Sequence, residues 1–301
     1  MAIGDVYDAE NCEDVHYVDT GMYDVAEYGS VYIVDAERPA LVDTGIGTHY
    51  ETILDAMAEV GIEPADLEVV ALTHVHLDHA GGVGHLVEAC PNATVYVHEI
   101  GAPHLVDPER LWEGTKQVVR DQIEYYTEPA PVPEARVVEL GDGGEIDLGD
   151  HTFEVAHAPG HAPHQVVFYD PAIDGVFTAD AAGIFTPSTG EVHVTSPPVN
   201  FDLEQAVMDI ETIREFGPGT LLYAHFGPEP TADRLDEYAD VLREWVDAVS
   251  ETRAEFGDDD AVVDHFVEAV ETPEVWSDHK ARAEMSMNVR GVLAMLDRAA
   301  E

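Results

Sequence analysis

The chain has 301 residues, 45% of them hydrophobic, which is enough for a large packed core. It carries 62 Asp and Glu against 13 Lys and Arg, a formal net charge of −49. Since this charge needs concentrated salt for screening, we expect a halophilic, acidic protein. We do not expect nucleic acid as a partner, because proteins bind its phosphates through cationic side chains.

The sequence predicts a cytoplasmic protein without a membrane partner. The first ten residues are acidic and contain no apolar core of a signal peptide. No apolar run approaches the roughly 18 residues of a membrane-spanning helix. The only cysteines, Cys12 and Cys90, are too few for a disulfide framework, so we expect both to serve packing.

The first half of the chain alternates between strand and helix patterns. Short β-branched runs typical of adjacent antiparallel strands occur at residues 15–18, 31–35 and 40–43. Ile53, Met57 and Val60 predict one face of a helix, and residues 68–72 predict a strand buried on both sides. A second helix is expected after Gly81-Gly82 and a strand at residues 94–97. We interpret the polar, partly helical insertion at residues 104–133 as a lid.

The second half repeats this alternation and then becomes helical. Strands are predicted near residues 136–139, 152–156, 165–169, 175–178 and 220–224, with a helix at 203–216. Two β-rich halves that are each followed by helices favour two face-to-face sheets with helices outside, an α/β fold. From residue 231 the apolar spacing is purely helical. We therefore predict a domain at residues 1–230 and a C-terminal helical region at residues 231–301.

The most informative segment is Thr-His-Val-His-Leu-Asp-His-Ala-Gly-Gly at residues 73–82, directly after the predicted buried strand. Loops at the carboxyl ends of strands are where α/β proteins build their sites. His74 and His76 are two residues apart, so an extended loop turns both imidazoles to one side, while Asp78 and His79 reach a second point nearby. Packing does not explain three histidines and an aspartate within six residues, and the pattern predicts two adjacent ligand sets.

This segment resembles the His-x-His-x-Asp-His signature of the metallo-β-lactamase fold superfamily, and four more markers of that family appear in order. They are Asp43 in Leu-Val-Asp-Thr-Gly, His161 in Pro-Gly-His-Ala, Asp180 in Phe-Thr-Ala-Asp and His225 in Tyr-Ala-His-Phe-Gly. The ordered set is far more specific than any one marker. The resemblance implies an αββα metallo-β-lactamase sandwich with the site at one edge.

The resemblance also implies a ligand set for two metal ions. Its members are His74, His76 and His161 for the first ion, Asp78, His79 and His225 for the second, and Asp180 as the bridge. Histidine and carboxylate without thiolate suit two Zn²⁺, although Fe or Mn also fits these ligand types. The ions would generate hydroxide from a bridging water near neutral pH. Asp78 is expected to orient that hydroxide and Asp43 to fix a ligand imidazole through its second ring nitrogen.

The superfamily is functionally broad, so the fold leaves the substrate open. The Gly-Gly after the motif, the insertion and the C-terminal helices look most like the glyoxalase II, lactonase and thioesterase-like branch. We therefore expect a hydrolase of a small-molecule thioester, lactone or related ester. The net charge adds the expectation that it comes from a haloarchaeon. The alternatives are a nuclease or phosphodiesterase, which the charge disfavours, a mono-iron persulfide-type oxygenase, and a regulatory binding protein with little turnover.

Three further residues are candidates for substrate contact. His164 follows the third motif closely and either contacts substrate or supports a ligand. Arg282 and Arg290 are eight residues apart on a predicted helix, about two turns or roughly 12 Å, and are predicted to clamp an anionic group. The alternative is that both form salt bridges on a solvated helix face. Whether the protein is a monomer or a dimer stays open.

Overall fold

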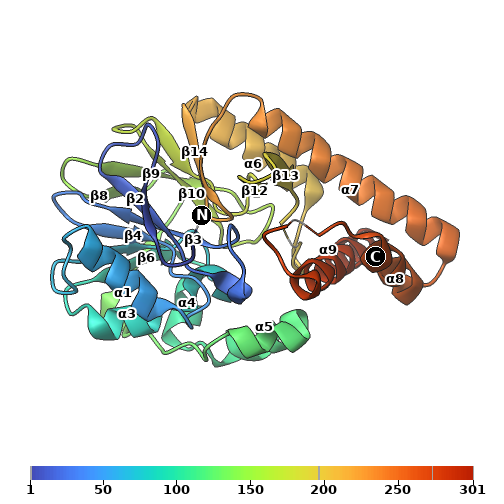
Figure 1. Cartoon of the computed structure of the whole chain (residues 1–301), viewed down its shortest axis with the longest axis horizontal. Coiled ribbons are helices and arrows are strands. Elements are labelled where there is room, and N and C mark those ends of the chain that lie inside the picture. Colours follow the sequence, from blue (N-terminus) through green and yellow to red (C-terminus); the bar gives the residue numbers. More distant parts are fainter. Residues whose placement is uncertain (1, 196, 273, 301) are drawn as a thin grey trace.

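The structure, a computed structural model, describes residues 2–195, 197–272 and 274–300. Two β-sheets pack face to face and helices cover their outer faces, which confirms the predicted αββα sandwich (Figure 1). In Figure 1 the sheets lie on the left, and the C-terminal helices, coloured orange to red, lie on the right.

The first sheet has seven strands that follow one another in chain order. They are β1 (Val6–Asp8), β2 (Val15–Asp19), β3 (Ser30–Val34), β4 (Ala40–Val42), β5 (Val69–Ala71), β6 (Thr94–His98) and β7 (Val137–Leu140). Pairing is antiparallel from β1 to β4 and parallel from β4 to β7. Within β3, Val31 and Ile33 face the helices while Tyr32 and Val34 face the second sheet, as the two-residue period of a strand requires.

The second sheet has six strands in the order β15-β14-β11-β10-β9-β8. They are β8 (Glu145–Asp147), β9 (Thr152–His157), β10 (Val166–Asp170), β11 (Gly175–Phe177), β14 (Thr220–Tyr223) and β15 (Gly227–Pro230). Val166 and Phe168 of β10 face the first sheet, and Val167 faces the outer helices. A separate hairpin is formed by β12 (Ile184–Thr186) and β13 (Glu191–His193).

Helices complete both outer layers. The α-helices are α1 (Tyr50–Glu59), α2 (Leu77–Ala80), α3 (Val83–Ala89), α4 (Ala102–Val106), α5 (Glu109–Val119), α6 (Leu203–Phe216), α7 (Arg234–Phe256), α8 (Asp259–Ala269) and α9 (Asp278–Ala300). Short 3₁₀ turns occur at Met22–Asp24, Arg120–Tyr125 and Glu134–Arg136. The apolar faces of α1 and α3 pack on the first sheet, whereas α6, α7 and α9 share a core with the outer face of the second.

The C-terminal helices are continuous with the sandwich. Leu235 and Leu242 of α7 and Val289 and Val292 of α9 belong to the same buried cluster as Val167 of β10. Helix α9 also contacts the insertion at residues 104–133, whose residues form α4, α5 and a 3₁₀ turn. The division at residue 230 stays a prediction, since the core runs across it.

The longer predicted elements are present and several short ones were missed. The predicted helix at residues 203–216 coincides with α6, and the antiparallel pairing of the early strands is as expected. Strands β1, β8, β12, β13 and β15 were not predicted: each has only three or four residues, and most of them are interrupted by charged residues or proline. No helix among the described residues is both long and apolar enough to cross a bilayer.

Candidate metal centre

The His-x-His-x-Asp-His segment changes from extended chain to helix in its middle. His76 has φ −60° and ψ 145°, and α2 begins at the next residue. His74 and His76 therefore project from the extended part, and Asp78 and His79 project from the helix. The other predicted site residues also follow strand ends: Asp43 follows β4, His161 follows β9, Asp180 follows β11 and His225 follows β14. The two sheets bring these separate loops to one place.

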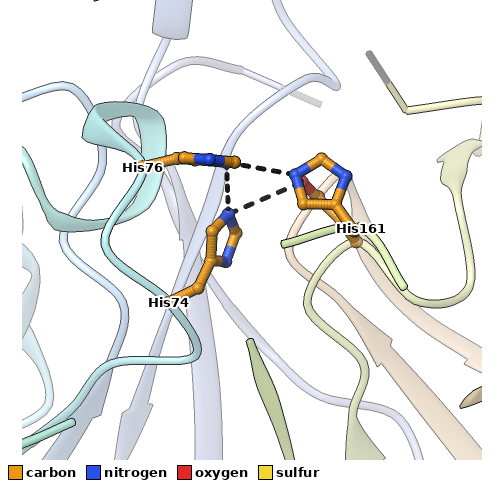
Figure 2. A group of neighbouring side chains, drawn as sticks. His74, His76 and His161 are labelled. Carbon is orange, nitrogen blue, oxygen red and sulfur yellow. Dashed lines mark hydrogen bonds and ion pairs between the residues drawn. The ribbon is translucent and has the colours of Figure 1, made fainter. Parts of the chain in front are cut away.

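The first group consists of His74, His76, His161 and Asp180, whose ligand atoms lie within 4.8 Å of one another. Nδ1 of His76 is 3.0 Å from Nε2 of His74 and 3.1 Å from Nε2 of His161. The three imidazoles turn their ring nitrogens toward a common centre (Figure 2). Convergence of several nitrogen lone pairs on one point is the arrangement that a tetrahedral metal site requires.

The second group consists of Asp78, His79 and His225. Nε2 of His79 is 3.2 Å from Nε2 of His225. An oxygen of Asp78 lies 3.8 Å from the first of these nitrogens and 3.9 Å from the second. These three side chains thus face one another as a second set of potential metal ligands.

Asp180 lies between the two groups and presents one oxygen to each. Its Oδ2 is 3.0 Å from Nε2 of His161 and 3.7 Å from Nε2 of His74. Its Oδ1 is 3.3 Å from Nε2 of His225 and 3.5 Å from Nε2 of His79, and this buried atom has no hydrogen-bond partner among the described residues. An orphaned buried carboxylate oxygen that faces imidazole nitrogens fits a bound cation.

Burial and mutual proximity set the protonation of these ligands. Burial, reinforced by neighbouring imidazoles, lowers the pKa of His74 well below its usual value and that of His76 to about 4. Burial alone would raise the pKa of Asp180, but His161 and His79 outweigh it and hold that pKa well below the usual range. At His79 burial alone would lower the pKa, but the carboxylates of Asp180, Asp43 and Asp78 outweigh it and raise the pKa well above its usual value. Neutral imidazoles and an ionised carboxylate are the states that bind metals, so a bound cation would take the place of the proton at His79.

A second layer of hydrogen bonds orients the imidazoles. Nδ1 of His79 lies 2.8 Å from Oδ2 of Asp43, and the amide and hydroxyl of Thr73 both donate to the same carboxylate. Nδ1 of His225 lies 2.8 Å from the carbonyl oxygen of Tyr28. Because these contacts occupy Nδ1 of both rings, the two Nε2 atoms face each other and the carboxylates of Asp78 and Asp180.

Comparison with known proteins places this arrangement in a family. The sequence model of the metallo-beta-lactamase superfamily matches residues 25–225. The chain belongs to this superfamily. Its members are generally metal-dependent hydrolases, and the two His/Asp groups of this chain are groups that could bind metal ions.

Individual relatives of this superfamily are distant. The chain is 27% identical over 222 residues to the Metallo-beta-lactamase fold-containing protein ST1585 of Sulfurisphaera tokodaii, covering 72% of this chain and 79% of that protein. It is 26% identical over 183 residues to the Acyl-coenzyme A thioesterase MBLAC2 of Gallus gallus, covering 55% and 62%. The crystal structure of ST1585 superposes with a TM-score of 0.70 at 21% identity and covers 94% of this chain and 99% of that one. At that identity the superposition supports the fold alone.

Tyr28, Lys280 and Glu284 lie beside the second group, and they were not assigned to the site from the sequence. We call these three residues the wall of the second group. The ring of Tyr28 lies 4.9 Å from that of His225, and its hydroxyl donates to Glu284 of α9 at 2.9 Å. Nζ of Lys280 donates to the same carboxylate and lies 3.7 Å from the centre of the Tyr28 ring. Lys280 is only 1% exposed. Two features of the sequence could have drawn attention to Lys280. The chain has only two lysines, and Lys280 stands four residues before Glu284, the spacing of an ion pair on a helix.

The insertion reaches the same wall. Tyr126, which follows the 3₁₀ turn Arg120–Tyr125, makes a hydroxyl-to-hydroxyl contact with Tyr23. Burial raises the pKa of both tyrosines well above the usual value, and each is affected further by the negative charge of Asp78. The insertion and α9 therefore both contribute to the surroundings of the second group.

The three predicted substrate residues lie in different places. His164 lies beside the first group, with its ring 5.2 Å from that of His76, and burial lowers its pKa to about 2. Arg282 donates to the carbonyl of Val267, and Arg290 pairs at 3.4 Å with Asp260, so both guanidinium groups contact the α8 segment. The anion clamp of Arg282 and Arg290 stays a prediction.

Proposed function

We propose that the protein is a cytoplasmic hydrolase of a small-molecule thioester, lactone or related ester and that its two His/Asp groups hold two Zn²⁺, with Fe or Mn as substitutes. The observation that carries this proposal is the position of Asp180, which turns one oxygen to each group and has a buried oxygen without a hydrogen-bond partner. A shared carboxylate of this kind is the expected centre of a two-metal site.

The chain's own residues hold and orient the reacting groups. His74, His76 and His161 would hold one ion, and Asp78, His79 and His225 the other, with Asp180 shared. Bound ions supply Lewis acidity and a hydroxide nucleophile near neutral pH. Asp78, itself a member of the second group, would also orient the attacking water and accept its proton. Water adds to the acyl carbon, the bond to sulfur or oxygen breaks, and the proton taken from the water passes to the departing sulfur or oxygen. A thioester or open-chain ester gives an acid and a thiol or alcohol, and a lactone gives a single hydroxy acid.

An acyl substrate is favoured over a phosphodiester by the surroundings of the site. Lys280 is the one lysine or arginine among the buried side chains of the described residues, and its ammonium is already engaged by Glu284. With a net charge of −49, the protein offers little to neutralise a polyanion. The thioesterase named among the relatives gives independent support for acyl chemistry.

A substrate panel tests this proposal. Protein purified in molar KCl is assayed with neutral thioesters, lactones, a phosphodiester and a short RNA, alongside Asp180→Asn and the control Asp264→Asn, an exposed residue of α8. We expect thioester or lactone hydrolysis that Asp180→Asn reduces by about 100-fold or more, equivalent to about 2.7 kcal/mol, and that Asp264→Asn leaves unchanged. Turnover of RNA alone would establish the nuclease instead, and oxygen-dependent turnover with one iron per chain would establish the mono-iron oxygenase.

A further inference from the structure

Tyr28 restrains the imidazole of His225 in two ways. Nδ1 of His225 lies 2.8 Å from the carbonyl oxygen of Tyr28, and the centres of the two rings lie 4.9 Å apart. The backbone of His225 is held separately, because its carbonyl accepts a hydrogen bond from the amide of Phe185 at 2.6 Å. With the backbone held, the direction of Nε2 depends on rotation of the ring. Tyr28 limits that rotation at the Nδ1 side.

Glu284 of α9 in turn holds the side chain of Tyr28. The hydroxyl of Tyr28 donates to Oε2 of Glu284 at 2.9 Å. Nζ of Lys280 donates to the same oxygen and lies 3.7 Å from the centre of the Tyr28 ring. The ring of Trp276 packs on Tyr28 with the two centres 5.3 Å apart. The hydroxyl and the ring of Tyr28 are therefore both held by one C-terminal segment of the chain.

Lys280 and Glu284 form a buried ion pair. Taking two charges out of water costs free energy that their attraction often fails to offset, and apolar side chains of similar volume are often at least as stable. A buried pair is therefore better explained by the arrangement that it imposes than by stability. The arrangement imposed here is that of Tyr28, on which both side chains converge. Because the two charges sum to zero, the pair adds no net charge beside the second group.

The loop of the first group is held from another part of the fold. The amide of Gly160, which precedes His161, donates to Asp209 of α6 at 2.6 Å. This contact involves neither Tyr28 nor α9. We therefore expect a change at Glu284 to affect the second group and to spare the first.

We propose that Glu284 is a positioning residue for the ion of the second group. Through Tyr28 it keeps Nε2 of His225 directed toward that group, so the affinity for this ion depends on the packing of α9. The inference rests on the proposed two-metal function and adds that the C-terminal helix controls how tightly one of the two ions is held. Loss of a residue that orients a metal ligand typically weakens metal binding by about 10- to 100-fold.

Two double variants remove both buried charges and differ in the acceptor that they leave for Tyr28. Lys280→Met/Glu284→Gln keeps an amide oxygen for the Tyr28 hydroxyl, whereas Lys280→Met/Glu284→Leu has no acceptor. Neither leaves an unpaired buried charge, and circular dichroism checks that both are folded. Tyr28→Phe removes only the hydroxyl, and it provides the test if the leucine variant does not fold.

Zinc binding is the readout. Chelator-stripped proteins are equilibrated in molar KCl at a series of free Zn²⁺ concentrations, and bound zinc is counted by mass spectrometry. We expect the leucine variant and Tyr28→Phe to hold the second ion about tenfold or more weakly than the wild type, with the first ion unchanged. The glutamine variant is expected to bind both ions as the wild type does. Wild-type affinities in the leucine variant and in Tyr28→Phe, or equal losses in the glutamine and leucine variants, overturn the proposal.

A further pair of proteins identifies the ion that is lost. Asp78→Asn weakens the second group, so its remaining ion is that of the first. Adding Tyr28→Phe to Asp78→Asn should leave the affinity for this ion unchanged, and a weaker affinity overturns the proposal. His151→Gln, which breaks a buried pair away from the ligands, is the control for a general loss of stability and should bind both ions normally.

The outcomes also separate this proposal from the proposed hydrolysis. Selective loss of the second ion in Tyr28→Phe, from a protein whose wild type hydrolyses no ester, overturns the hydrolase and keeps the positioning role. Ester hydrolysis by a two-ion wild type whose zinc affinities Tyr28→Phe leaves intact keeps the hydrolase and overturns the positioning role. A wild type that binds fewer than two ions overturns both.

Discussion

At the scale of single residues, Asp180 has the environment that bound cations explain best. Its carboxylate is 4% exposed, faces four imidazoles and leaves one oxygen without a hydrogen bond. Four imidazole nitrogens around one carboxylate would be poorly matched as hydrogen-bond partners, because neutral imidazoles also present lone pairs. Cations between them turn each lone pair into a favourable contact.

Replacing Asp180 by alanine tests this interpretation. Asp180→Ala leaves both groups short of the shared ligand, so we expect it to lower the metal content to less than half that of the wild type and to remove most activity. Metal quantification by mass spectrometry and circular dichroism are measured on the same sample, since a folded chain is required. A folded Asp180→Ala protein with full metal content and activity would contradict the shared role.

His151 and Asp170 form a buried pair away from the metal ligands and predict a pH dependence. Nδ1 of His151 lies 2.7 Å from Oδ2 of Asp170, and this hydrogen bond, opposed by burial, raises the pKa of His151. A raised pKa means that the pair stabilises the fold in full below the usual histidine value of about 6.5, and that the stabilisation is lost as pH rises through the folded-state pKa.

We therefore expect His151→Gln to lower the free energy of unfolding by about 1 kcal/mol near pH 6 and by less as pH rises above the folded-state value. The measurement is denaturant unfolding in molar KCl across this pH range. His16→Gln serves as the control, because His16 pairs with Asp8, whose side chain is 93% exposed, and we expect it to have little effect. A difference for His151→Gln that grows with pH would contradict the assignment.

The residues that the sequence revealed are those that carry a local motif. His74, His76, Asp78 and His79 form one contiguous pattern, and the remaining ligand candidates were found through an ordered family resemblance. Tyr28 and Glu284 are 256 positions apart and meet only because α9 folds back onto the sandwich. No local pattern encodes that contact, so this wall of the site could not be predicted.

At the scale of secondary structure, close packing fixes the loop that carries His161. Gly160 precedes this histidine, and a Cβ at Gly160 would lie 2.2 Å from the amide nitrogen and 2.3 Å from the Cα of Ala206 in α6. The amide of Gly160 also donates to Asp209 of the same helix at 2.6 Å. Helix α6 and the loop are thus held at a separation that only glycine permits.

Gly160→Ala should push the His161 loop away from α6. We expect a loss of about 1–3 kcal/mol in unfolding free energy together with weaker metal retention by the first group. Gly114→Ala is the matched control, since Gly114 lies in α5 with open space around its Cβ position, and there we expect a gain of up to about 1 kcal/mol. Equal stability and metal content in Gly160→Ala and the wild type would show that the loop adjusts freely.

Element prediction succeeded where hydrophobic periodicity was long and failed where tertiary contacts decide. Helix α6 was predicted at its observed bounds because four turns of apolar spacing mark it. Strand β15 reads Gly-Pro-Glu-Pro and has no strand signal, yet it pairs with β14 across four residues. The pairing is imposed by its neighbour and by the edge position, where proline is tolerated.

At the scale of the whole molecule, the net charge of −49 predicts salt-dependent stability. In dilute buffer the Debye length is about 30 Å at 0.01 M salt, so the acidic groups repel across the molecule, whereas at 1 M it is about 3 Å. We expect the melting temperature to be lower in dilute buffer than in molar KCl. An equal or higher melting temperature in dilute buffer would contradict the halophilic prediction.

The central claim is that two adjacent groups sharing Asp180 hold the ions that support hydrolysis. The most direct measurement strips the purified protein with a chelator in molar KCl and follows its recovered activity as Zn²⁺ is added back, with bound metal counted in each sample. We predict an inactive apoprotein whose activity reaches a plateau at about two ions per chain. An apoprotein with full hydrolytic activity, or a plateau at one ion, would contradict the account.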